Sequence, residues 1–198
     1  MDHASIVNYG YDIRAYKNFL DPAICQVLIN KFEADERKQE SPQSEGYYNN
    51  RKSIELRISP LPEWNDWDQI IFKKIGSTLN EYYSSYRVGI EYEDEGYTIC
   101  KYNIGDGVNF HWDGGCLTRL TTAVIQLNSP QEGGKLIFPL KNLEIKPEQG
   151  TLLLFPPTYT HAHYVEATED IPRYIISTWI HIKPDGQRAL REVTLPGL

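Results

Sequence analysis

The chain has 198 residues, of which 40% are hydrophobic and 24% are charged, and its formal net charge is -7. These values are typical of one globular domain, and no apolar run is long enough to cross a membrane. The acidic balance argues against a general nucleic-acid-binding surface. We therefore expect a single domain over residues 1–198, with no nucleic-acid or membrane partner. Because the first residues lack a basic segment followed by an apolar stretch, a cytoplasmic location is expected.

Residues 23–33 are predicted to form the first helix. Asp21 suits the N-cap position, and Pro22 suits the first helical position, where a backbone N–H has no helical partner. Apolar residues then recur at the spacing of one helical face, which should pack on the core. The members of this predicted face are Ile24, Val27, Leu28 and Phe32.

A polar segment over residues 34–52 is rich in Glu, Gln, Ser and Asn, which predicts a loop. A second helix is expected over residues 67–83, where apolar residues again follow helical spacing. Its predicted buried face consists of Ile70, Ile71, Ile75, Leu79 and Tyr82. Residues 1–90 are therefore interpreted as a helical support together with a substrate loop.

From Tyr97 onward the pattern changes to short strands separated by turns. Strands are predicted over residues 97–102, 120–127, 135–138, 151–155 and 173–182. Glycine-containing turns are expected at 131–134 and 147–150. Many short strands without long helices between them indicate an antiparallel sandwich or barrel. The predicted fold is mainly β with flanking α-helices, and its core is a double-stranded β-helix (jelly roll) over residues 97–182.

One group of residues suggests a metal site. His111 and Asp113 are two residues apart, so on extended backbone their side chains point to the same side. Alone, such a pair is equally well explained as a surface histidine beside a solvated aspartate. A further ligand candidate, either His161 or His163, follows an apolar strand about fifty residues later. Two histidines and one carboxylate form the facial triad of non-haem iron sites, which leaves positions open for oxygen and a chelating acid.

The ordered motifs between residues 97 and 182 resemble the prolyl 4-hydroxylase type of Fe(II)- and 2-oxoglutarate-dependent oxygenases. The matching segments are Tyr-Asn-Ile-Gly at 102–105, His-Trp-Asp at 111–113, Arg119, Thr122, Leu-Asn at 127–128, Gly-Gly-Lys-Leu-Ile-Phe-Pro at 133–139, residues 147–156, His163, Arg-Tyr at 173–174 and Trp-Ile at 179–180. In that family a basic anchor follows the distal histidine by about nine or ten positions. Arg173 stands ten positions after His163 and twelve after His161. The resemblance therefore favours His163 as the ligand and gives His161 a supporting role.

The resemblance implies a dioxygenase that uses Fe(II), 2-oxoglutarate and O2 to hydroxylate an unactivated C–H bond. The iron ligands would be His111, Asp113 and His163. Arg173 would bind the distal carboxylate of 2-oxoglutarate, because a guanidinium presents two parallel donors to a carboxylate.

Three further residues are expected in the co-substrate pocket. Tyr102 and Thr122 match positions that hydrogen-bond the same carboxylate region, although ordinary packing explains them equally well. Gln126 stands where some relatives carry a tyrosine, so the pocket is expected to differ there.

The substrate is less well specified by the residues. A groove is expected to be lined by Tyr48, Arg51, Trp112 and Tyr159, together with Tyr47. The resemblance favours a prolyl or other residue in a peptide or protein, and the alternative is a free amino acid or small metabolite. From another class of protein, the alternative is a non-catalytic, metal-binding cupin-like module, which would need the metal ligands but not Arg173. A purely structural jelly roll would need neither.

Overall fold

The computed structural model describes residues 5–41, 51–86, 91–116 and 118–183. Two antiparallel sheets form its core. The large sheet has the strand order β1 (Ile6–Asn8), β2 (Arg14–Tyr16), β11 (Leu152–Phe155), β8 (Arg119–Gln126), β13 (Arg173–Ile182), β6 (Thr98–Tyr102), β4 (Ile54–Arg57) and β3 (Gln39–Glu40), and β5 (Tyr92–Asp94) also pairs with β13. The small sheet has the order β10 (Leu143–Ile145), β9 (Leu136–Phe138), β12 (His163–Val165) and β7 (Val108–His111). This arrangement confirms the predicted class, a mainly β protein with a jelly-roll core.

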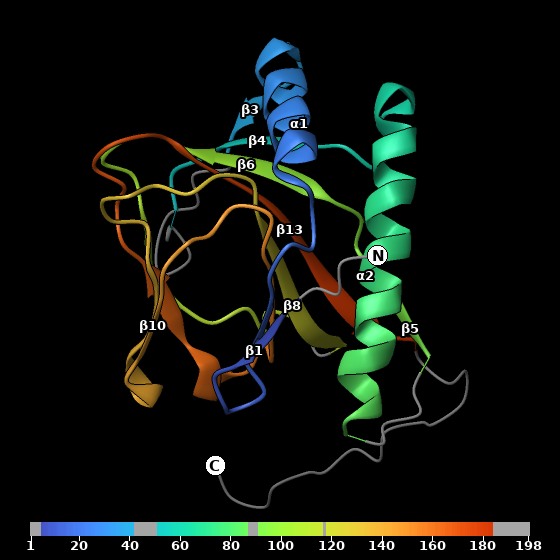
Figure 1. Cartoon of the computed structure of the whole chain (residues 1–198), viewed down its shortest axis with the longest axis vertical. Coiled ribbons are helices and arrows are strands. Elements are labelled where there is room, and N and C mark those ends of the chain that lie inside the picture. Colours follow the sequence, from blue (N-terminus) through green and yellow to red (C-terminus); the bar gives the residue numbers. More distant parts are fainter. Residues whose placement is uncertain (1–4, 42–50, 87–90, 117, 184–198) are drawn as a thin grey trace, which may run out of the picture.

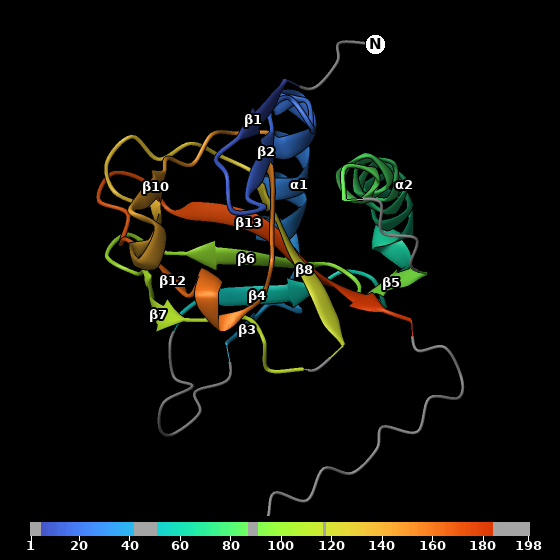
Figure 2. The same cartoon turned by 90° about the horizontal axis from the view of Figure 1, so that it is seen from below.

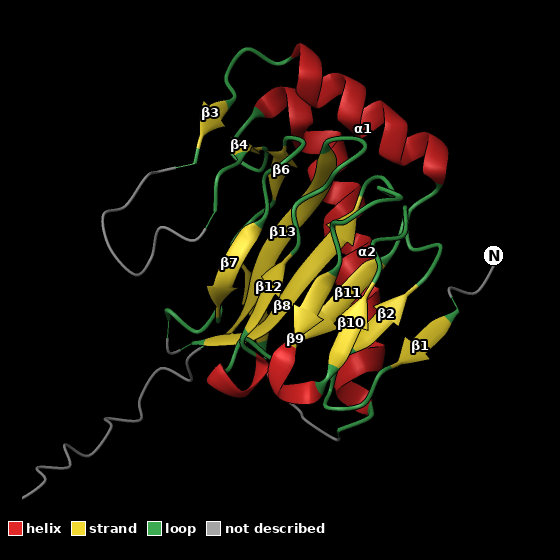
Figure 3. Ribbon diagram, turned by 90° about the vertical axis from the view of Figure 1, so that its left-hand side faces the viewer, coloured by secondary structure: helices red, strands yellow, loops and turns green. Residues whose placement is uncertain are grey.

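Two helices cover one face of the large sheet, and the small sheet faces the other (Figure 1). The two helices are α1 (Pro22–Ala34) and α2 (Asn65–Ser84). The chain also forms three short 3-10 turns, η1 (Pro62–Trp64), η2 (Pro139–Lys141) and η3 (Tyr159–His161). Figure 2 shows the same layers from below, and Figure 3 shows the small sheet in front of the large one. None of the helices in the described part of the chain is both long and apolar enough to cross a membrane.

The alternation of side chains along the central strands divides the interior into two apolar clusters. On β8, Ala123 and Ile125 face the helices, whereas Thr122 and Val124 face the space between the sheets. Along β13 the odd-numbered residues from Arg173 to Trp179 likewise line that space. Because successive side chains of a strand point to opposite faces, every second residue of these two strands faces the region between the sheets.

Helix α1 begins as predicted, because the Asp21 side chain accepts a hydrogen bond of 2.7 Å from the backbone N–H of Ala23. Its buried face differs in part from the prediction. That face consists of Cys25, Leu28, Ile29 and Phe32. Val27 is 47% exposed, so its assignment to the core was wrong. The buried residues follow i, i+3, i+4, i+7 spacing, and Val27 falls outside this stripe.

Helix α2 shows the same kind of deviation. Its buried residues are Ile71, Ile75, Leu79, Tyr82 and Tyr83. Ile70 was predicted to belong to this face but is 40% exposed, because it lies about 100° around the helix from Ile71. The polar segment predicted as a loop over residues 34–52 contains the short edge strand β3, which pairs with β4.

A glycine in the turn before β9 permits a close backbone approach. Gly133 has φ +72°, and a Cβ there would lie 1.9 Å from the carbonyl oxygen of Ala167. Gly10 has a similar φ of +78°, but apart from its two chain neighbours no described residue has an atom within 4 Å of the Cβ position. The two sites therefore share the conformational cost of a left-handed backbone and differ in steric space.

We expect Gly133→Ala to destabilise the protein more than Gly10→Ala does. Both variants carry about 1–2 kcal/mol for a side chain in the left-handed region. Only Gly133→Ala adds overpacking, which costs roughly 1–3 kcal/mol. Urea denaturation of both variants measures the difference, and equal losses in the free energy of unfolding would contradict this account of the turn.

Candidate active site

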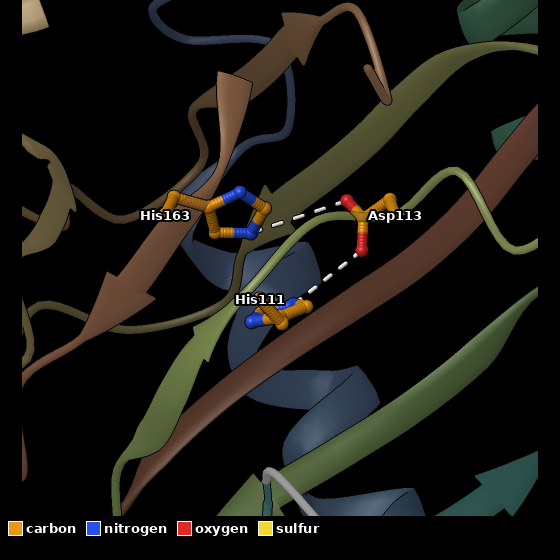
Figure 4. Close-up of side chains that lie close together, drawn as sticks. All are labelled: His111, Asp113 and His163. Atoms are coloured by element: carbon orange, nitrogen blue, oxygen red, sulfur yellow. Dashed lines mark ion pairs between the residues drawn. The ribbon is translucent and has the colours of Figure 1, made fainter. Parts of the chain in front are cut away.

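Two histidines face each other across neighbouring strands of the small sheet. His111 ends β7, His163 begins β12, and the two are directly paired in the strand register. Their ring centroids are 4.4 Å apart. Asp113 follows two residues after His111, and one potential ligand atom from each of the three residues lies within 4.8 Å of the others (Figure 4). The structure therefore brings together side chains that are fifty residues apart in the sequence.

The hydrogen bonds of the two imidazoles determine which ring nitrogen faces the centre of this cluster. His111 Nδ1 lies 2.8 Å from the carbonyl oxygen of Asn109, and His163 Nδ1 lies 3.0 Å from that of His161. A carbonyl oxygen only accepts, so both Nδ1 atoms must donate, and a neutral ring then presents a lone pair at Nε2. Each Nε2 points toward the Asp113 carboxylate, with N···O distances of 3.4 Å from His111 and 4.0 Å from His163.

The ionisation states strengthen this arrangement. Burial lowers the pKa of His163 to about 4, so its ring is neutral at neutral pH. For Asp113, burial raises the pKa, but interactions with His111, His163 and the Thr122 hydroxyl outweigh it and lower the pKa to about 2. With the His163 ring neutral, its Nε2 and the charged Asp113 carboxylate both face the centre as potential metal ligands, and His111 Nε2 is the third. This set of nitrogen and oxygen donors fits a divalent cation such as Fe(II).

A buried cation lies in the same interior. Arg173, on β13, is 3% exposed, and its Nε donates to Gln126 Oε1 at 3.2 Å. Its guanidinium carbon is 5.6 Å from the centre of the Tyr102 ring. Burial lowers the pKa of Arg173, although a guanidinium stays protonated in proteins. Within the described ranges no carboxylate forms an ion pair with it. Because an unpaired buried charge costs several kcal/mol, this position favours an anionic ligand.

One cavity of about 310 Å³ connects the histidine–aspartate cluster with Arg173. Of the expected substrate residues, Arg51 and Trp112 line this cavity. Tyr159 lies in η3, is 72% exposed and does not line it. Tyr47 and Tyr48 fall outside the described residues. Of the expected site residues that the structure describes, Gln126 and Tyr159 do not line the cavity, and all the others do.

Two of the expected co-substrate residues lie beside or near Arg173. Tyr102 is buried and lines the cavity, and Gln126 contacts Arg173 directly, so their binding to a co-substrate stays a prediction. Thr122 also lines the cavity, but its hydroxyl donates to Asp113 Oδ2 at 2.8 Å. The Thr122 hydroxyl is thus engaged by the carboxylate of the histidine–aspartate cluster.

The side chain of His161 forms its hydrogen bonds outside the histidine–aspartate cluster. Its Nε2 donates to the carbonyl oxygen of Tyr11 at 2.7 Å, so its Nδ1 accepts from the Thr158 hydroxyl at 2.9 Å. Only its backbone carbonyl reaches His163. His161 therefore ties η3 to the loop between β1 and β2 and is not part of the cluster.

Arg119 lines the cavity too, although the sequence motif that contains it suggested no role for it. Its Nη1 donates to the carbonyl oxygen of Asp113 at 2.8 Å, and its Nε donates to Glu95 at 3.0 Å. The guanidinium carbon lies 4.0 Å from the centre of the Trp179 ring. Trp179 also lines the cavity. The resemblance includes Arg119 and Trp179 among its matching residues but gives neither of them a role.

Residues 97–181 match the 2OG-Fe(II) oxygenase superfamily. No curated protein matches the chain significantly in sequence. Among solved structures, the viral collagen prolyl hydroxylase of Paramecium Bursaria Chlorella virus-1, in complex with 2OG, is similar, with 23% identity, a TM-score of 0.67 and coverage of 88% of this chain and 98% of that chain. For a Pseudomonas putida prolyl-4-hydroxylase the identity is 17%, the TM-score 0.65 and the coverage 88% and 95%.

A third similar structure is a Trichoplax adhaerens prolyl hydroxylase in complex with a peptide fragment of the hypoxia inducible factor oxygen degradation domain. It is 20% identical, with a TM-score of 0.66, and the alignment covers 87% of this chain and 84% of that chain. At these identities the likeness shows a shared fold, which covers 87% to 88% of this chain.

The different environments of the two neighbouring histidines lead to a prediction. His163→Ala removes a ring nitrogen from the cluster and should weaken Mn²⁺ binding beyond the roughly 10–100-fold that loss of a supporting residue costs. His161→Ala should leave Mn²⁺ affinity unchanged, because the carbonyl that orients His163 remains. It should instead lower the free energy of unfolding by about 1–3 kcal/mol, since the Tyr11 carbonyl loses its donor.

Calorimetric titration with Mn²⁺ and urea denaturation of both variants provide the measurements. The assignment fails if His161→Ala loses the metal while His163→Ala keeps it.

Proposed function

We propose that this chain is an Fe(II)- and 2-oxoglutarate-dependent oxygenase of the prolyl 4-hydroxylase-like kind and that it hydroxylates a residue of a peptide or protein, with proline as the first candidate. One observation carries the proposal: the side chains of His111, Asp113 and His163 share a single cavity with the buried Arg173, which forms no ion pair with a carboxylate of the described residues. A ferrous ion would suit the first group, and one carboxylate of a dicarboxylic acid would suit Arg173.

In this proposal His111, Asp113 and His163 hold the iron through their Nε2 atoms and a carboxylate oxygen. When bound, iron and 2-oxoglutarate supply the activation of O2 that breaks an unactivated C–H bond. Because these three residues would supply only part of the ligands of an iron ion, the co-substrate and oxygen would supply the rest. The protein contributes the geometry, the charge balance and the exclusion of water.

Arg173 is proposed to bind the distal carboxylate of 2-oxoglutarate. Its Nε hydrogen bond to Gln126 restricts rotation of the guanidinium, so the Nη atoms are free to form a bidentate pair with a carboxylate. Tyr102 lies beside the guanidinium and would form part of the pocket wall. Gln126, where some relatives carry a tyrosine, would act here through Arg173.

Apolar side chains around His163 support the exclusion of water. The rings of Phe138 and Phe155 lie 5.3 Å and 5.1 Å from the ring of His163, centre to centre. Leu136 and Val165 add further apolar wall to the cavity. In a dry site of this kind, fixed charges such as Asp113 and Arg173 act with less screening than in water.

An extended substrate is supported by the shape of the surface around the cavity. A second cleft of about 480 Å³ adjoins the first, because Arg51, Val108 and Val165 line both. Along the same strand, β7, Phe110 is 58% exposed and Trp112, just beyond its end, is 49% exposed. Two connected clefts flanked by exposed aromatic rings suit a polypeptide better than a free amino acid.

A cytoplasmic location stays a prediction.

Arg173→Ala should raise the KM for 2-oxoglutarate sharply. Loss of one partner of a buried, hydrogen-bonded charge pair costs about 2–5 kcal/mol, which is roughly 30-fold or more. The KM of Arg173→Lys for 2-oxoglutarate should lie between those of Arg173→Ala and the wild type, because an ammonium keeps the charge but not the bidentate geometry. Succinate release measures the effect, and Mn²⁺ affinity without co-substrate serves as the control.

The cupin-like alternative makes the opposite prediction for this experiment. In that case the wild type binds the metal but releases no succinate, and Arg173→Ala changes nothing.

The substrate class is tested with a panel of proline-containing peptides beside free amino acids. We expect 2-oxoglutarate-dependent succinate release to be stimulated by peptides, together with a mass gain of one oxygen atom on the peptide. Stimulation by free proline or another free amino acid, with none by any peptide, would replace the peptide proposal by the small-molecule alternative.

A further inference from the structure

The three proposed iron ligands do not have equal support from the backbone. His111 and His163 sit at paired positions of β7 and β12, so the strand ladder fixes both. Asp113 lies beyond the end of β7, in the connection between β7 and β8. Strand β8 begins at Arg119. No strand register holds it. Its position must therefore come from other contacts.

Two hydrogen bonds from β8 supply those contacts. The Thr122 hydroxyl donates to Asp113 Oδ2 at 2.8 Å, and Arg119 Nη1 donates to the Asp113 backbone carbonyl at 2.8 Å. One bond therefore fixes the carboxylate, and the other fixes the main chain of the same residue. Thr122 is 3% exposed and Asp113 is 9% exposed, so water competes little for the bond between them.

The strand that provides both donors is held on both sides. β8 lies between β11 and β13 in the large sheet, and Thr122 is paired with Phe155 on one side and Trp179 on the other. The Arg119 guanidinium is further fixed by Glu95, at 3.0 Å and 3.3 Å, and by the Trp179 ring beneath it. The donors are thus pre-oriented before any ligand enters.

We infer that Thr122 and Arg119 are positioning residues, which clamp the loop-borne Asp113 for metal binding. The inference rests on the proposed iron site. It gives the Thr122 hydroxyl the role of holding the carboxylate of Asp113, a proposed iron ligand, instead of binding 2-oxoglutarate. The bond to Thr122 occupies one lone pair of Oδ2 and restricts rotation of the carboxylate. The bond from Arg119 prevents the loop from drawing Asp113 away from the two imidazoles.

The sharpest test replaces the Thr122 hydroxyl while keeping the side-chain shape. Thr122→Val should raise the Kd for Mn²⁺ by about 10–100-fold, the range found when partners of metal ligands are lost. Thr122→Ser keeps the hydroxyl and should bind Mn²⁺ like the wild type. At saturating Mn²⁺, the Kd for 2-oxoglutarate should be the same in all three proteins. Calorimetry measures both constants.

Two outcomes would overturn the inference. If Thr122→Val binds Mn²⁺ normally but binds 2-oxoglutarate more weakly, Thr122 serves the co-substrate. If Thr122→Val and Thr122→Ser lose affinity equally, the loss comes from packing and not from the hydroxyl.

Arg119→Met provides a second, independent variant should Thr122→Val not fold. It removes the donor to the Asp113 carbonyl while keeping an unbranched apolar stem over Trp179. It should also weaken Mn²⁺ binding, and wild-type affinity in this variant would contradict the clamp. Failure of the wild type itself to bind Mn²⁺ would instead refute the proposed iron site, so the two failures are distinguishable.

Discussion

The site depends on two imidazole nitrogens and one carboxylate that converge in a single cavity. The Nδ1 atoms of His111 and His163 donate to backbone carbonyl oxygens, so each ring directs its Nε2 toward Asp113. Burial lowers the pKa of His163 and so favours the neutral ring, whose Nε2 lone pair can bind a metal ion. Two nitrogens and one carboxylate oxygen within reach of one another form a ligand set that suits a divalent cation.

The jelly roll places the positive charge of Arg173 in the same cavity as the histidine–aspartate cluster. Arg173 projects from β13 of the large sheet into the same space that β7 and β12 of the small sheet approach from the opposite side. One sheet therefore supplies the cationic end of the cavity and the other supplies two histidines of the cluster. A ligand with a carboxylate at one end and a metal-chelating group at the other would complement both. This separation of charge follows from strand topology, since neither sheet alone contains both ends.

Much of the fold and of the candidate site could be predicted from the sequence, because local patterns of residues specify them. Strand β11, which follows the turn that ends at Gly150, and the longer strand β13 were predicted to within one residue. The short strands β7 and β12 were not predicted, because they have only four and three residues and the pairing of His111 with His163 is non-local. The exposed Val27 shows that spacing alone cannot tell a core residue from an apolar surface residue. The bond from Thr122 to Asp113 likewise depends on how β8 packs beside the loop, which no local pattern encodes.

A crystal structure of the protein with Mn²⁺ and 2-oxoglutarate, recorded with anomalous scattering from the metal, tests the central claim most directly. The account predicts one strong anomalous peak bonded to His111, His163 and Asp113, with the far carboxylate of the dicarboxylic acid paired to Arg173. A metal peak away from these three side chains, or a dicarboxylate that does not touch Arg173, would contradict it.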